Sequence, residues 1–364
     1  MQLYMDRHDI PGTTAKAVAE AHQLDLAIQG KYKCKALTYW FDEGKGIAFC
    51  LIEAPDKKSV EEMHKNSHGL IPNQIIEVEG NIVELFLGRI LDPEVAKNSD
   101  RFENFINETA FRTIMYIDLK HPLINLKSGD DKEIEITDIH YNMIREALKQ
   151  YYGREVKYTY EGLMASFTSV SNSVNCALEI QKGFKAESKI VVAIGLSTGD
   201  PVTSRNDFFG DSILLAKRLC EIANEGQIVV TSAVRNLYKD KKINLANNGS
   251  IKILSPIEEK FLNQLMEITE QVWNDSGINV TNFSKQIGLS KAQLYRKTTS
   301  LTGTSPNEFI RKYRLNQALK LIEKKNGNIS EIAFESGFSS PSYFSKCFQK
   351  RFGILPSDYA HTIV

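Results

Sequence analysis

Long apolar runs are missing from this sequence. No stretch approaches the ~20 consecutive apolar residues that a membrane-spanning helix requires, and the first residues do not have the form of a secretory signal peptide. Cysteine is scarce: there are five cysteines, an odd number, and none forms a Cys-x-x-Cys pair. This pattern is typical of reduced thiols rather than of a disulfide framework. We therefore expect a cytoplasmic protein that does not enter a membrane.

An overall excess of one charge is also missing, since 45 Lys and Arg residues balance 45 Asp and Glu residues. The balance does not hold locally. From Gly277 onward, thirteen basic residues stand against five acidic ones. A basic segment of this kind is suited to the phosphates of a nucleic acid. At 364 residues, the chain has room for two or three domains with cores of their own.

The C-terminal part contains the same helix-turn-helix pattern twice. In the first copy, Gly288 supplies the left-handed residue of the turn and Ser290 caps the second helix. In the second copy, Gly337 has the role of Gly288, and Ser339 or Ser340 caps the helix. A helical bundle that binds no nucleic acid is the plainer interpretation, and the local basic excess argues against it.

A single long helix is expected between the two copies. From Pro306 to Lys325 it would be ~30 Å long at 1.5 Å per residue. Successive major grooves on one side of B-DNA lie ~34 Å apart. Two recognition helices joined by this helix can therefore enter adjacent grooves.

Three motifs, Leu301–Leu315, Ile332–Phe348 and Phe352–Tyr359, resemble the AraC-type DNA-binding domain over about the last hundred residues. The resemblance implies a transcription regulator that binds double-stranded DNA, with RNA polymerase as a partner if it activates. The family pattern implies base contacts by Ala292, Tyr295, Arg296, Ser342, Ser345 and Lys346, and phosphate contacts by Lys291 and Lys350.

Residues 1–80 show the order strand, helix, strand, strand, helix, strand, which predicts an α+β ferredoxin-like domain. Four of the seven histidines lie in this domain, and His64 and His68 share one helix face. The segment resembles a family of small ferredoxin-like proteins with reported nickel binding. The candidate metal ligands are His8, His22, Asp25, His64 and His68.

Imidazole and carboxylate donors suit nickel, copper or zinc, and the sequence does not rank these metals. Metal affinity is expected to fall as the pH drops through ~6.5, because binding requires neutral imidazole. Two other interpretations stay open: the histidines cluster by chance, or they serve a dimer surface.

Residues 110–240 alternate strands and helices and resemble the class III nucleotidyl cyclase domain. The resemblance depends on five segments: Tyr116–Asp118, Gly153–Phe167, Ala193–Asp200, Asp207–Leu219 and Gly226–Ser232. It implies an α/β fold, a head-to-tail homodimer, and a nucleotide site formed by Asp118, Lys157, Glu161, Asp207 and Arg218.

The catalytic pattern of that family is incomplete here. Glu161 stands where the second metal-binding aspartate is expected, and Leu214 replaces an asparagine that stabilises developing charge. The phosphate loop contains His121 and Pro122, and proline offers no amide donor. We therefore expect no catalytic residues in this domain. Retained binding of an adenine nucleotide stays open.

The sequence thus predicts a multidomain protein: a ferredoxin-like sensor (1–80), a connector (81–109), a degenerate cyclase-like domain (110–240), a linker (241–256) and an all-α double helix-turn-helix domain (257–364). We interpret it as a transcription regulator controlled by an effector at the N-terminal or cyclase-like domain. The rivals are an active adenylate cyclase tethered to DNA and a metal-binding protein with a DNA tether.

Overall fold

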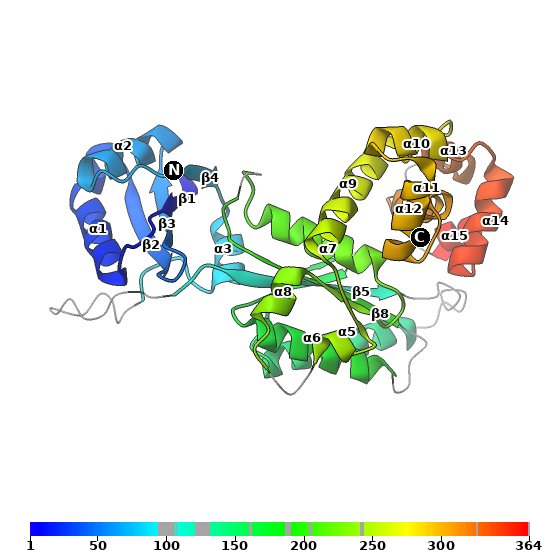
Figure 1. The fold of residues 1–364 in the computed structure, drawn as a ribbon, viewed down its shortest axis with the longest axis horizontal. Coiled ribbons are helices and arrows are strands. Elements are labelled where there is room, and N and C mark those ends of the chain that lie inside the picture. The colour runs from blue at the N-terminus through cyan, green and yellow to red at the C-terminus, as the bar shows by residue number, and fades with distance from the viewer. Residues whose placement is uncertain are drawn as a thin grey trace.

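The computed structural model describes residues 1–93, 106, 108–120, 132–159, 162–185, 191–203, 206–240, 244–324 and 327–362. Its elements form successive N-terminal, middle and C-terminal units, which run from blue to red in Figure 1. No helix within the described ranges is long and apolar enough to cross a bilayer.

The N-terminal unit is an antiparallel sheet of order β2-β3-β1-β4 with α1 and α2 on the same face (Figure 1). Both helices begin at side-chain caps: Thr14 accepts a hydrogen bond from the Ala17 amide, and Asp56 accepts one from the Ser59 amide. The elements are β1 (Gln2–Asp9), α1 (Ala15–Ile28), η1 (Gln29–Tyr32), β2 (Lys35–Asp42), β3 (Ile47–Ala54), α2 (Lys57–Ser67) and β4 (Gln74–Glu77).

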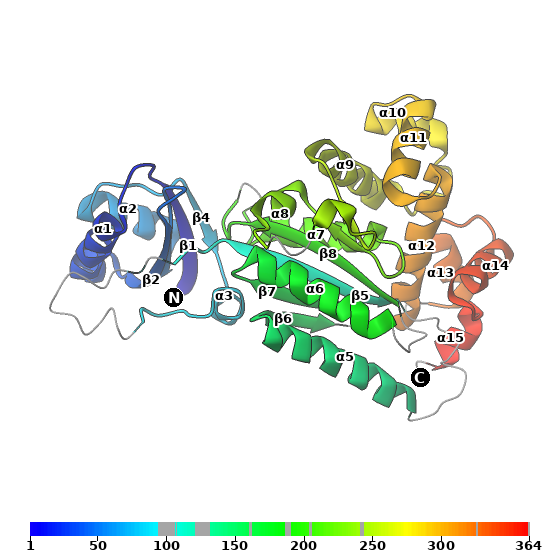
Figure 2. The ribbon, with the colours of Figure 1, turned by 60° about the horizontal axis from the view of Figure 1, so that its bottom comes forward.

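The middle unit is a mixed sheet of order β10-β9-β8-β5-β7-β6. Helices α5 and α6 cover one face of this sheet, and α7 covers the other (Figure 2). Its elements are α3 (Gly80–Leu87), β5 (Arg112–Lys120), α5 (Lys132–Gln150), β6 (Arg154–Thr159), β7 (Gly162–Phe167), α6 (Val170–Lys185), β8 (Val191–Gly199), α7 (Gly210–Ile222), β9 (Ile228–Val230), α8 (Ser232–Leu237), η3 (Leu245–Asn247) and β10 (Ile251–Ile253).

Two segments assigned to connections contain structure that belongs to the middle unit. The predicted connector 81–109 overlaps α3, and the buried Arg112 of β5 donates to the carbonyls of Phe86 and Leu87 at the end of that helix. The predicted linker 241–256 contains β10, which pairs in parallel with β9. Polar composition suggested a linker there, whereas the short apolar alternation Ile251–Ile253 is sufficient to add a strand at the sheet edge.

The C-terminal unit is helical, and α12 runs through it as a central rod (Figure 2). At one end of α12, Phe309 and Ile310 pack into the core of the first helix-turn-helix. Further along, Ala318 and Ile322 pack into the core of the second. The helices are α9 (Pro256–Val272), α10 (Val280–Ile287), α11 (Lys291–Thr302), α12 (Pro306–Glu323), α13 (Ile329–Glu335), α14 (Pro341–Phe352) and α15 (Pro356–Thr362).

Apolar cores cross both boundaries between units. Met5 and Trp40, on the sheet face opposite α1 and α2, belong to one cluster with Phe86, Met164 and Phe209. A second cluster combines buried residues of α7 and the middle sheet with residues of the C-terminal unit; its members include Leu219, Cys220, Val229, Leu262, Leu265 and Phe283. The middle unit is therefore packed on both sides, against the N-terminal sheet and against the first helix-turn-helix.

Candidate metal centre and nucleic-acid interface

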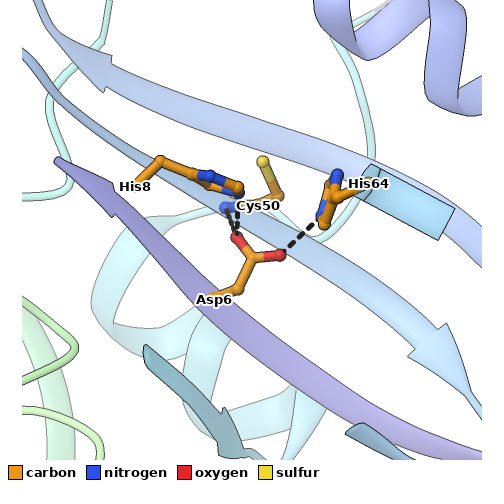
Figure 3. A group of neighbouring side chains, drawn as sticks. All are labelled: Asp6, His8, Cys50 and His64. Carbon is orange, nitrogen blue, oxygen red and sulfur yellow. Dashed lines mark hydrogen bonds and ion pairs between the residues drawn. The ribbon is translucent and has the colours of Figure 1, made fainter. Parts of the chain in front are cut away.

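Four possible metal ligands from three elements meet beneath α2, and we call them the first donor group: Asp6, His8, Cys50 and His64. Asp6 and His8 are two residues apart on β1 and therefore share a face, and Cys50 is the register partner of Asp6 on β3. His64 approaches from α2, with its Nε2 2.8 Å from Asp6 Oδ2 (Figure 3). The donor atoms of the group all lie within 4.8 Å of one another.

A second donor group, Asp25, His64 and His68, adjoins the first and shares His64 with it. His64 Nδ1 lies 3.1 Å from Asp25 Oδ2 and 3.0 Å from His68 Nε2. His68 Nε2 in turn lies 3.3 Å from Asp25 Oδ2. The two ring nitrogens of His64 thus face different donor groups, which makes His64 the centre of the cluster.

Opposite charges offset the cost of burying these side chains. Burial by itself favours a neutral His64, but Asp6 and Asp25 outweigh it and raise the pKa of His64 to about 10. Burial likewise opposes the charge of Asp6, yet His8 and His64 lower the pKa of this carboxyl well below its usual range. His64 and His68 do the same for the pKa of Asp25. The protonated ring of His64 therefore lies between the carboxylates of Asp6 and Asp25.

The residues present fit a transition metal ion. His8 is 4% exposed, and its Nε2 is buried without a hydrogen-bond partner among the described residues, although Asp6 Oδ1 lies 3.3 Å away. A buried ring nitrogen in this state is costly unless something binds it. Imidazole nitrogen, carboxylate oxygen and a thiol together form a donor set for nickel, zinc or copper.

The structure brings together most of the predicted metal ligands, with one exception. His8, Asp25, His64 and His68 belong to the donor groups, whereas His22 belongs to neither among the described residues. Its Nε2 lies 3.1 Å from Asp92 Oδ2. Its predicted role followed from the spacing to Asp25 on one helix, but a shared helix face does not fix where two rings point. His22 as a ligand stays a prediction.

Asp6 and Cys50 are additional donors that were not among the predicted site residues. A signal for Asp6 was present, since it alternates with His8 on a predicted strand and therefore lies on the same face. Cys50 had no comparable local signal. Its place opposite Asp6 depends on the pairing of β1 with β3, which is a contact between residues 44 positions apart.

The predicted nucleotide residues are dispersed or engaged. Lys157 and Asp207 are exposed, and half-buried Asp118 interacts electrostatically with Arg351 of α14. Arg218 is 1% exposed and bonded to side chains of α9. Glu161 and the loop residues His121 and Pro122 lie outside the described residues, so the nucleotide site and the absence of turnover stay predictions.

The second helix of each helix-turn-helix is presented to solvent. Ser290 caps α11 in a capping box with Gln293, and Ser340, rather than Ser339, caps α14 by accepting from the Tyr343 amide. Gly288 and Gly337 both have positive φ, at 74° and 76°. The exposed candidates for DNA contact are Lys291, Ala292, Tyr295, Arg296, Ser342, Lys346 and Lys350.

Two side chains of α14 differ from the expectation. Ser345 is half-buried, and its hydroxyl donates to the Pro341 carbonyl at 2.9 Å, which occupies its only proton. Tyr343 is 50% exposed, with its hydroxyl 3.4 Å from Arg311 Nη1. Tyr343 lies within the motif Ile332–Phe348, and the structure adds it to the solvent-facing surface of this helix.

Comparison with known proteins assigns the two ends of the chain. Residues 283–362 match a family described as a helix-turn-helix domain, and residues 4–78 match one described as a nickel responsive protein, SCO4226-like. The histidine kinase P4 of Formosa agariphila is 42% identical over 106 residues, which is 29% of this chain and 8% of that protein. The probable transcription factor PqrA of Proteus vulgaris is 31% identical over 102 residues, which is 28% of this chain and 84% of that protein.

The chain belongs to the AraC-type helix-turn-helix family, as a sequence-specific DNA-binding transcription regulator. The middle unit matches less well. A solved adenylate/guanylate cyclase/hydrolase from Silicibacter pomeroyi is 29% identical, with a TM-score of 0.30, over 35% of this chain and 78% of that one. A similarity this weak does not assign the middle fold.

Proposed function

We propose that this regulator is controlled by a divalent transition metal ion, nickel foremost, bound at the first donor group. The observation that carries the proposal is the convergence of four buried donors, Asp6, His8, Cys50 and His64, whose ligand atoms all lie within 4.8 Å of one another. The similarity of residues 4–78 to a nickel responsive family supports nickel as the first metal to test.

Asp6, His8, Cys50 and His64 would hold the ion, and the second donor group would orient His64 from its other ring nitrogen. When bound, the ion supplies a positive charge that replaces the proton on His64 and links β1, β3 and α2. Burial raises the pKa of the Cys50 thiol, with a further contribution from Asp6, so the thiol is neutral until an ion approaches. Binding is therefore coupled to the loss of protons.

Metal analysis and calorimetry of the full chain test the proposal. The wild type, dialysed against nickel and then against metal-free buffer, is expected to keep bound nickel. His64→Gln is expected to bind far less, because second-sphere and direct interactions at metal sites typically change affinity 10–100-fold or more. His22→Gln is the matched control, a buried histidine of the same unit that lies outside both donor groups.

Equal loss of bound nickel in His64→Gln and His22→Gln would show that the ion is not bound at the first donor group. A wild type that retains neither nickel, zinc nor copper would refute metal control. In that case a surface for assembly becomes the better account of the N-terminal unit. Calorimetric titration with zinc and copper ranks the three metals, which the donor set alone does not do.

The finer assignments remain part of this proposal. The strand orders support a ferredoxin-like N-terminal domain and a cyclase-like middle domain. A homodimer, a contact with RNA polymerase and a cytoplasmic location are predictions of the sequence. The rival function, adenylate cyclase, would use Arg218 in its nucleotide site, and in this structure Arg218 is bonded to α9. We therefore favour a middle unit whose role is structural and regulatory.

A further inference from the structure

The N-terminal sheet is bonded to the loop that precedes α7. Arg7 Nη1 donates to the Val202 carbonyl at 3.0 Å, and Gln74 Nε2 donates to the Thr203 carbonyl at 2.6 Å. Arg7 is the residue between Asp6 and His8 on β1, so its side chain points to the sheet face opposite the donor groups. β1 is therefore bonded directly to this loop from the face opposite the donor groups.

The loop leads into α7 through a packed turn. The Phe209 amide donates to the Pro201 carbonyl at 2.8 Å, and the Phe209 ring stacks on Phe86 with centroids 5.0 Å apart. Helix α7 begins at the next residue, Gly210. Because Phe208 and Phe209 belong to the same core as Met5 and Trp40, the start of α7 is fixed against the N-terminal unit.

At the other end of α7, Arg218 is bonded to the first helix of the C-terminal unit. Its Nη1 donates to Asn263 Oδ1 at 2.9 Å, and its Nη2 lies 3.3 Å from Glu270 Oε1. Glu267 lies 3.5 Å from the guanidinium as well. Arg218 is almost wholly buried, so these α9 partners compensate its charge.

A second contact reaches the recognition helix itself. Lys252 of β10 donates from Nζ to the carbonyls of Leu301 at 2.6 Å and Ser300 at 3.3 Å. These carbonyls lie in the last turn of α11, where the helix leaves acceptors unpaired and favours a cation. Burial lowers the pKa of Lys252, and the strand that carries this lysine belongs to the middle sheet.

We propose that Arg218 and Lys252 are positioning residues for DNA recognition: from the middle unit they hold α9 and α11, so that a change at the donor cluster, passed on through Arg7 and Gln74, alters how α11 is presented to DNA. The proposal depends on the metal control proposed above. Neither residue touches DNA in this account; Arg218 acts through α9, and Lys252 acts through the end of α11.

The test measures the DNA affinity of the full chain with and without Ni²⁺, by fluorescence anisotropy on a duplex selected by the wild type from a random-sequence pool. For the wild type, nickel is expected to change the dissociation constant by roughly 5- to 150-fold, the usual range of allosteric coupling. Lys252→Met and Glu270→Gln are each expected to bring this factor towards 1, while calorimetry shows an unchanged nickel affinity.

Glu270→Gln is the variant less at risk of misfolding, because the Glu270 side chain is 40% exposed and the substitution leaves no cavity in a core. Lys260→Met is the matched control for Lys252→Met, since it removes the same charge from an exposed position of α9. Lys252→Arg should restore the nickel response, because a guanidinium can also donate to the α11 carbonyls. A merely structural role would lower the melting temperature without changing the ratio of affinities.

Gln74→Met tests the N-terminal contact, with the exposed Gln23→Met on α1 as its control. It is expected to reduce the nickel response and to leave both nickel and DNA affinity in place. Full retention of the response in Lys252→Met, Glu270→Gln and Gln74→Met overturns the inference, as does a wild type that binds nickel and DNA independently. Absence of nickel binding, in contrast, refutes the metal control itself.

Discussion

At the scale of single residues, His64 belongs to both donor groups, and the raised pKa of its ring changes the expected pH dependence of metal binding. Sequence reasoning assigned the pH dependence of metal binding to an ordinary imidazole, near 6.5. The carboxylates of Asp6 and Asp25 instead raise the pKa of His64 to about 10. The proton that a metal ion must displace is therefore present throughout the neutral range, and the pH window for binding moves upward.

We predict that nickel binding at pH 7.5 releases about two protons, one from His64 and one from the Cys50 thiol, whose pKa is raised by burial, and that the apparent nickel affinity rises with pH throughout the neutral range. Calorimetry in buffers of different ionisation enthalpy counts the protons. A proton count near one, from the thiol alone, would show that His64 is neutral in the metal-free chain.

In the metal-free chain, the protonation of His64 should also affect the stability of the fold. Because the folded pKa of His64 lies above its unfolded value of ~6.5, its contribution is complete below pH ~6.5 and is lost as the pH rises towards about 10. The melting temperature of the wild type should therefore fall more steeply over this window than that of His64→Gln. Parallel curves would contradict the ion pairs with Asp6 and Asp25.

At the scale of elements, α11 and α14 present different sets of side chains. Arg296 is exposed and can make two hydrogen bonds to a guanine. Arg296→Ala is expected to cost about 1–3 kcal/mol of DNA binding and to relax one base position. Ser345→Ala is expected to change little, since the Ser345 hydroxyl is already bonded to Pro341. Selection from random duplexes by each variant, with measured dissociation constants, checks both, and equal effects would refute this assignment.

The two turn glycines form a second matched pair within these elements. Both have positive φ, so alanine at either costs about 1–2 kcal/mol of backbone strain. A Cβ at Gly288 meets nothing within 4 Å, whereas one at Gly337 would lie 2.7 Å from the Trp273 carbonyl oxygen. Gly337→Ala should therefore destabilise the C-terminal unit more than Gly288→Ala. Thermal unfolding measures the difference in stability. Equal losses of stability would mean that the Trp273 backbone shifts at little cost to make room for the Cβ.

Local patterns predicted these elements well, because caps, turn glycines and helical spacing act within a few residues. Gly288, Ser290 and Gly337 have the expected roles. His64 and His68 share the carboxylate partner Asp25, although α2 ends at Ser67 and His68 is its C-cap residue. The sequence could not predict that Cys50 lies opposite Asp6, or that Lys252 caps α11. Those contacts depend on strand pairing and on packing between units, which no local spacing encodes.

At the scale of the whole molecule, the middle unit connects a metal-binding candidate to a DNA-reading unit. Arg7 and Gln74 bond it to the N-terminal sheet, and Arg218 and Lys252 bond it to α9 and α11. Apolar cores are shared across both boundaries. The chain is thus built as a continuous series of packed units, which provides a set of contacts through which a response can be transmitted.

The most direct measurement of the central claim is the DNA affinity of the wild type and of His64→Gln, each with and without Ni²⁺. Nickel is expected to change the dissociation constant of the wild type by several-fold or more and to leave that of His64→Gln unchanged, with equal affinities of the two proteins in metal-free buffer. A nickel effect of the same size in both proteins, or in neither while the wild type holds nickel, would contradict control through this site.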